Sequence, residues 1–164
     1  SVEKIRARED ELLEIAFDKF SRISQLHILA SNVKERLGVI SFYVENLHHN
    51  LMVKLLNDRY GIQVRGGCSC AGTYGHLLLH VSQQQSREIT NLIDQGDLSR
   101  KPGWVRLSLH PTMTNDELLY ILNAIQKVIE NAEKWARDYS YSSSTNEFHH
   151  RSEKGEPRLD WFDL

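Results

Sequence analysis

Two cysteines and an arginine stand close together in the glycine-rich stretch 64–72, which is Val-Arg-Gly-Gly-Cys-Ser-Cys-Ala-Gly. Glycines leave the backbone free to take positive φ and to let another group approach closely, which favours a turn. Arg65 precedes Cys70 by five residues and supplies positive charge that favours a thiolate, the nucleophilic form of cysteine. The stretch is consistent with a reactive thiol loop or with two small residues that pack as apolar side chains.

A metal site is a weaker interpretation of the same region, with Cys68, Cys70, His76 and His80 as ligands. The two histidines are four residues apart and could share a helix face, and thiolates with imidazoles suit Zn²⁺. The Cys-x-Cys spacing is shorter than zinc motifs normally use. A disulfide across it would be strained. We therefore predict neither a metal ion nor a disulfide.

A second arginine, Arg106, stands in a segment where apolar and polar residues alternate, as they do in a half-buried strand. One side carries Val105, Leu107 and Leu109, and the other carries Trp104, Arg106, Ser108 and His110. A guanidinium on the polar side could bind a carboxylate through two parallel hydrogen bonds. It could equally be a solvated surface charge.

The elements that must position these residues follow from the spacing of apolar residues and from capping signals. Helices are predicted over 2–23, from about 48 to 60, over 74–80 and 82–95, and from 114 to about 139; strands are predicted over 39–45, 61–65 and 104–110. Gly61 is a helix stop, and Thr114 with Glu117 forms a capping box. His48 and His49 are expected at a helix start facing solvent.

This order of elements predicts an α+β fold, with a small antiparallel or mixed sheet covered by helices. We expect an N-terminal helical segment over 1–29, an α+β domain over 30–139 and a polar, loosely ordered tail over 140–164. Residues 82–103 look like an inserted excursion.

Composition excludes several classes of function. The 164-residue chain has 20 basic and 22 acidic residues, a net charge of −2, which gives no basic surface for nucleic acid or an anionic membrane. No apolar run approaches the roughly 20 residues of a membrane span, and the N-terminus lacks the apolar core of a signal peptide. Two cysteines make no disulfide framework, so a reducing, cytoplasmic setting is expected.

Four segments of the sequence resemble the C-terminal small domain of class V aminotransferases, which belong to fold type I of the pyridoxal-phosphate enzymes. They are 37–42 (Leu-Gly-Val-Ile-Ser-Phe), 61–70 (Gly-Ile-Gln-Val-Arg-Gly-Gly-Cys-Ser-Cys), 105–108 (Val-Arg-Leu-Ser) and 115–118 (Asn-Asp-Glu-Leu). The resemblance runs from about residue 30 to 135 and favours the cysteine desulfurase and selenocysteine lyase branch.

The resemblance implies roles for three residues. Cys70 falls where desulfurases place the thiol that takes sulfur from cysteine, and Arg106 falls where the family binds the substrate α-carboxylate. Arg65 matches the arginine that begins the family's loop. Desulfurases commonly have two histidines where Cys68 and Ser69 stand here, and the segment from Cys70 to Arg106 is longer than the family's.

The resemblance also implies a cofactor that this chain does not hold. Family members bind pyridoxal phosphate as a Schiff base on a lysine of a large domain, and no lysine here has that sequence context. We therefore expect a small domain joined through 1–29 to a missing large domain, with no cofactor-binding residue of its own and no turnover alone. The full-length enzyme is expected to be a homodimer that acts on an amino acid.

Three alternatives stay open at this stage. Transamination would need Arg106 and the missing domain but not the Cys70 thiol. A binding or scaffold module could retain the fold without the chemistry. The weakest alternative is the cysteine and histidine metal site.

Overall fold

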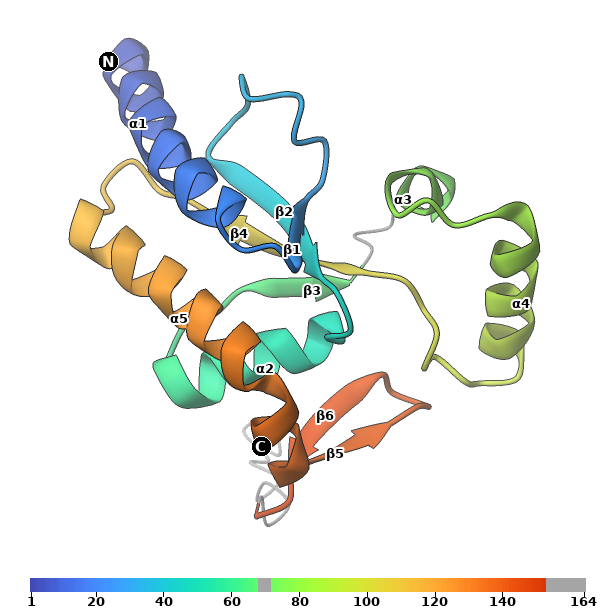
Figure 1. Cartoon of the computed structure of the whole chain (residues 1–164). Coiled ribbons are helices and arrows are strands. Elements are labelled where there is room, and N and C mark those ends of the chain that lie inside the picture. The colour runs from blue at the N-terminus through green and yellow to red at the C-terminus, as the bar shows by residue number, and fades with distance from the viewer. Residues whose placement is uncertain (68–71, 153–164) are drawn as a thin grey trace, which may run out of the picture.

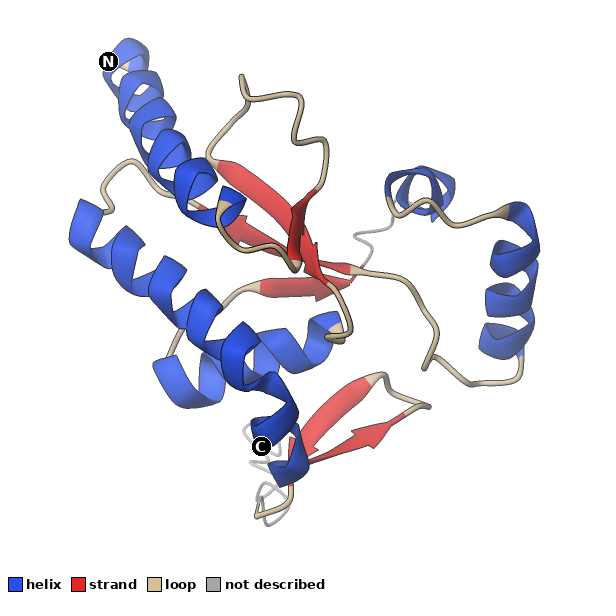
Figure 2. Cartoon of the chain, viewed as in Figure 1, coloured by secondary structure: helices blue, strands red, loops and turns tan. Residues whose placement is uncertain are grey.

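The computed structural model describes residues 1–67 and 72–152, so Cys68 and Cys70 lie outside the described residues. Figures 1 and 2 show a small sheet with helices packed beside it and a separate hairpin near the C-terminus. The helices are α1 (Val2–Ser21), α2 (His49–Tyr60), α3 (Gly72–Leu78), α4 (Gln83–Asp94), α5 (Asn115–Trp135) and the short 3₁₀ helix η1 (Ala136–Asp138). The strands are β1 (Leu26–Ile28), β2 (Val39–Val44), β3 (Arg65–Gly67), β4 (Trp104–Ser108), β5 (Tyr139–Ser142) and β6 (Glu147–His150).

The main sheet has the order β1-β2-β4-β3, and all its neighbouring strands are antiparallel. The segments predicted over 39–45 and 104–110 share this sheet, and of the predicted strand over 61–65 only Arg65 belongs to it. The α+β prediction is confirmed. The strand predicted over 61–65 begins only at Arg65, because Gly61 ends α2 in the left-handed conformation with φ of 65°. The short strand β1 was not predicted, since three residues show no readable alternation.

Helices α1, α2 and α5 bury their apolar sides against one face of the sheet. The most deeply buried large side chains are Leu12, Phe20, Ile40, Phe42, Met52, Leu55, Leu56, Val105, Leu118, Leu122, Ile125 and Val128. The predicted stripe along α5 therefore packs on the sheet as expected. Thr114 and Glu117 make both hydrogen bonds of the predicted capping box at the start of α5.

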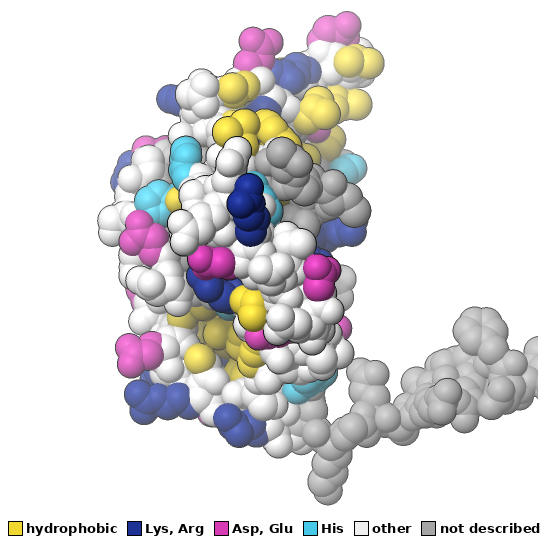
Figure 3. Space-filling model, turned by 90° about the vertical axis from the view of Figure 1, so that its right-hand side faces the viewer, with side chains coloured by type: hydrophobic (Ala, Val, Ile, Leu, Met, Phe, Trp, Pro, Cys, Tyr) yellow, Lys and Arg dark blue, Asp and Glu magenta, His cyan; other side chains and the backbone are white. Residues whose placement is uncertain are grey.

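Helices α3 and α4 form an excursion that projects beyond the end of β3 and β4 (Figure 1). They are joined by a hydrogen bond of 2.9 Å between Ser86 Oγ and His76 Nδ1. The side of the molecule that carries them displays basic and acidic side chains dispersed among one another (Figure 3). No helix in the described part of the chain is long and apolar enough to cross a membrane.

The expectation of a loose polar tail from residue 140 is wrong for 140–150. That stretch forms the hairpin of β5 and β6, in which Tyr141 pairs with Phe148. The hairpin is ordered by partners far away in the sequence, since Tyr139 Oη donates to Asp58 Oδ2 at 2.9 Å. Residues 153–164 lie outside the described residues, and the division of the chain into domains stays a prediction.

The expectation that His48 and His49 face solvent is also wrong. His49 is only 8% exposed, and the His48 ring stacks on it with centroids 4.4 Å apart. Burial, reinforced by His48 and Lys101 nearby, lowers the pKa of His49 from 6.5 to about 4. Burial also lowers the pKa of His48. Both rings are therefore neutral near pH 7.

Two leucines on α5 provide a matched test of the core. Leu122 is fully buried, whereas Leu119 is 41% exposed. We expect Leu122→Ala to lower the free energy of unfolding by about 2–5 kcal/mol, because it opens a cavity in the core. Leu119→Ala should change it by less than about 0.5 kcal/mol. Urea unfolding measures both, and equal losses would contradict the observed orientation of α5.

The buried His49 predicts a loss of stability in acid. Its pKa is lowered in the folded state, so below about pH 6.5 the unfolded chain binds a proton that the folded chain does not. The free energy of unfolding should fall by about 2 kcal/mol between about pH 7 and about pH 5 through this group. Urea unfolding across this pH range should show that the free energy of unfolding falls less steeply for His49→Gln than for the wild type. Parallel pH profiles for wild type and His49→Gln would contradict the prediction.

Candidate functional site

Arg65 and Arg106 lie directly opposite each other on β3 and β4. Ser41 of β2 lies opposite Arg106 on its other side, so the three residues form one row across the sheet. Residues opposite each other in antiparallel strands project from the same face. Because Val105 and Leu107 are buried beneath the helices, this row lies on the other face.

The two arginines make an unfavourable pair unless an anion joins them. Their β-carbons are expected to be about 4.5–5.5 Å apart, and like charges opposite each other destabilise a sheet. No carboxylate among the described residues forms an ion pair with either arginine. The Nε of Arg106 is buried and has no hydrogen-bond partner among them. A buried donor without a partner is costly, so the row suits a ligand with a carboxylate or a similar anion.

The start of α2 supports this row from the opposite face of the sheet. A β-carbon on Gly66 would lie 2.7 Å from Asn50 Oδ1, and one on Gly103 would lie 2.5 Å from His49 Cε1. A side chain at either position would therefore displace Asn50 or the buried ring of His49. Gly66 and Gly67 belong to β3, although the sequence placed them in a turn, because they pair with Val105 and Trp104.

The structure brings together two of the three residues predicted for the site. Arg65 is exposed on β3 and Arg106 is half-buried on β4. Cys70 lies outside the described residues, and β3 ends at Gly67 just before that segment. The weak metal hypothesis gains no support from the described part, where no group of three potential metal ligands lies close together.

Sequence reasoning missed Ser41 and His49. Alternation along 39–45 already placed Ser41 on the side away from the core, but its position beside Arg106 depends on strand order. His49 gave a misleading signal, since a polar residue at a helix start is usually exposed.

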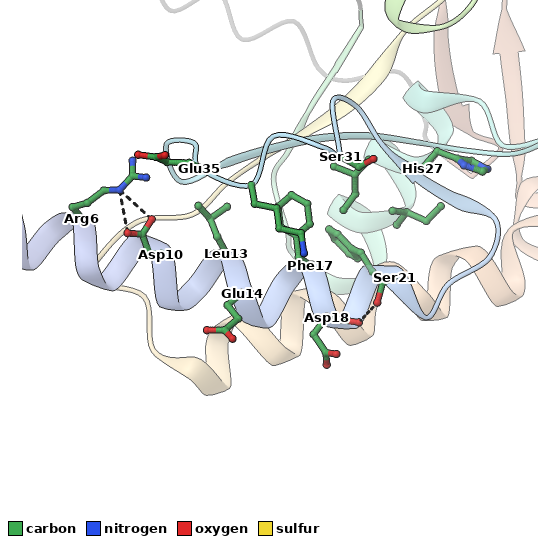
Figure 4. A pocket seen from close by; sticks show the side chains of 14 residues that line it. Arg6, Asp10, Leu13, Glu14, Phe17, Asp18, Ser21, His27, Ser31 and Glu35 are labelled. Carbon is green, nitrogen blue, oxygen red and sulfur yellow. Dashed lines mark hydrogen bonds and ion pairs between the residues drawn. The ribbon is translucent and has the colours of Figure 1, made fainter.

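A separate groove of about 1160 Å³ lies between α1 and the segment 26–35. Figure 4 shows Leu13 and Phe17 in it, with the ion pair of Arg6 and Asp10 at one end. Neither Arg65 nor Arg106 lines it, so the arginine row is the better candidate site.

Comparisons with known proteins identify the family of this chain. A probable cysteine desulfurase of Halobacterium salinarum is 32% identical over 69 residues, which cover 42% of this chain and 16% of that protein. A cysteine desulfurase of Haloferax volcanii is 23% identical over 111 residues, which cover 61% of this chain and 25% of that protein. The chain thus spans about a quarter of these relatives or less.

The fold has a counterpart among solved structures. The crystal structure of the cysteine desulfurase CsdA (S-sulfonic acid) from Escherichia coli matches with a TM-score of 0.51 and 20% identity, over 79% of this chain and 26% of that one. The sequence model of the class-V aminotransferases matches residues 1–121. The chain therefore belongs to the class-V aminotransferase family.

Proposed function

We propose that this chain is the small-domain part of a cysteine desulfurase-like enzyme and provides its carboxylate-binding arginine and its sulfur-accepting thiol. The observation that carries the proposal is the pairing of Arg65 with Arg106 on the sheet face away from the core. Family membership and the two desulfurase relatives support the same reaction class.

In this proposal Arg106 binds the α-carboxylate of the amino-acid substrate. Its guanidinium can donate two parallel hydrogen bonds to a carboxylate, and its buried Nε is a donor still in need of an acceptor. Arg65 adds a second positive charge opposite it, and Ser41 lies beside it on the same face. A carboxylate held here would be fixed in orientation as well as bound.

Cys70 is proposed as the nucleophile, on the strength of its position in the family's loop. Its thiolate would form a bond to the substrate sulfur as the carbon–sulfur bond of the substrate breaks. The electron pair of that bond would stay on carbon, which takes up a proton, and Cys70 would be left as a persulfide. A free thiol with this role is best kept in a reducing compartment, which supports a cytoplasmic enzyme.

Pyridoxal phosphate would supply the electron sink that weakens the carbon–sulfur bond. The described residues do not fit it, because each described lysine is exposed or half-buried and none lies enclosed as a Schiff-base lysine does. We propose that the cofactor is bound by a larger part of the enzyme, which functions as a homodimer, and that this chain alone is inactive.

Arg106 gives the first test, in the full-length enzyme. Arg106→Ala should lower kcat/KM. The fall should correspond to a loss of about 2–5 kcal/mol of transition-state stabilisation if the ion pair with the substrate is desolvated. Arg106→Lys should recover only part of this, because lysine lacks the planar fork. Arg87→Ala on exposed α4 is the control and should have no effect.

Thermal unfolding of this chain completes that test. Arg106→Ala should leave its melting temperature almost unchanged, because the substitution also removes a like-charge repulsion. A large loss of stability together with normal kinetics in the folded fraction would make Arg106 a structural residue.

Cys70 gives the second test. In the full-length enzyme Cys70→Ala should abolish release of sulfide from cysteine while cofactor binding, followed by absorbance, is retained. Cys68→Ala should have a much smaller effect. Full sulfide release by Cys70→Ala would reject the thiol assignment and favour transamination, which needs Arg106 but no thiol.

A further inference from the structure

The hairpin of β5 and β6 lies outside the residues that the class-V model matches, and the proposed function does not use it. It is nevertheless fixed at three places. Tyr139 Oη donates to Asp58 Oδ2 at 2.9 Å, Asn50 Nδ2 donates to the Asn146 carbonyl at 2.6 Å, and the Leu98 amide donates to the Ser143 carbonyl at 2.8 Å. Both ends of α2 and the connection after α4 are therefore tied to the hairpin.

The side of the hairpin that faces α2 encloses the ring of His48. The ring centroid of His48 lies 5.4 Å from that of Tyr141 and 5.3 Å from that of Phe148. His48 Nδ1 accepts a hydrogen bond from the Asn50 amide at 3.1 Å and so caps α2. The hairpin consequently holds the residue that precedes and caps the start of α2, and it sets the position of the two residues that follow.

Those two residues, His49 and Asn50, pack closely against β3 and the residue before β4, and these two strands carry the arginine row. Asn50 fills the space beneath Gly66, and His49 fills the space beneath Gly103. Gly66 follows Arg65 in β3, and Gly103 directly precedes β4, which carries Arg106. A shift of the start of α2 would therefore be transmitted to both strands.

We propose that the β5–β6 hairpin is a positioning element for the site, and that it acts through His48 and His49 to hold β3 in register beside β4. His49 is then a positioning residue, not a catalytic one. The effect on substrate rests on the proposed function, but the effect on the strands does not.

A general stabilising role accounts for only part of this arrangement. The most deeply buried large side chains lie in α1, α2, α5, β2 and β4, and the hairpin adds only Tyr139 to the buried hydrophobic core, with Phe148 packed against it. α2 is held in the core by its own Leu51, Met52, Leu55 and Leu56. Loss of the hairpin contact should therefore loosen the start of α2 and β3 locally and leave the core intact.

Amide hydrogen exchange on this chain tests the proposal without any assay of activity. Phe148→Ala should speed exchange of the amides that link β3 to β4 by about tenfold or more, and leave those that link β1 to β2 unchanged. Phe148→Tyr, which keeps the ring, should restore slow exchange. Val128→Ala is the control, since it weakens the core from a fully buried position on α5 and leaves the residues of the hairpin unchanged. Two results would overturn the proposal. One is unchanged exchange of the amides between β3 and β4, and the other is equal acceleration of exchange between β3 and β4 and between β1 and β2.

The full-length enzyme then provides a kinetic measurement. Phe148→Ala should raise KM for the amino acid several-fold and leave kcat close to wild type, because a displaced arginine row loses binding in the ground state and the transition state alike. If Arg106→Ala has no effect on kinetics, the proposed function fails, while the exchange result still decides the role of the hairpin. A fall in kcat at unchanged KM would overturn the link to the arginine row.

Discussion

Strand β4 lies between β2 and β3. The position of the candidate site depends on which side chains of β4 project from each of its two faces. Val105 and Leu107 are buried against the helices, so Arg106 between them must project from the other face. A slip of one residue would bury the arginine and expose the apolar pair. The hydrophobic core thus fixes the register of β4, and the pairing of β4 with β3 then places Arg65 opposite Arg106.

This register has an electrostatic cost that the fold alone does not explain. Two guanidiniums stay charged at any physiological pH, and the described carboxylates leave both without an ion-pair partner. Local arrangements that disfavour folding are expected at functional sites, where the rest of the protein offsets them. A bound carboxylate would remove the repulsion and satisfy the buried Nε of Arg106. In the proposed function, this cost in the free chain would become affinity for the substrate carboxylate.

The parts of the fold that were predictable are those with a strong local pattern. The long stripe of α5, the capping box at Thr114 and the alternation along β4 are all visible in short windows of sequence. The β5–β6 hairpin was not predictable, because Tyr141 and Phe148 owe their partly buried positions to His48, almost a hundred residues earlier. The burial of His49 likewise depends on Gly66 in β3 and on Gly103 directly before β4. Such contacts become evident only when the strand order is known.

The three predicted site residues also differ in what identifies them. Alternation identifies Arg106 as a side chain pointing away from the core, and the sheet order adds Arg65 and Ser41 to it. The role proposed for Cys70 comes from likeness to a family. The match to the family model ends at residue 121, in the first half of α5 and before the hairpin begins. Family membership can therefore suggest which residues carry out the chemistry. The residues that we propose hold them in place, His48 and His49, are identified by packing, including the close approach of α2 to Gly66 and Gly103.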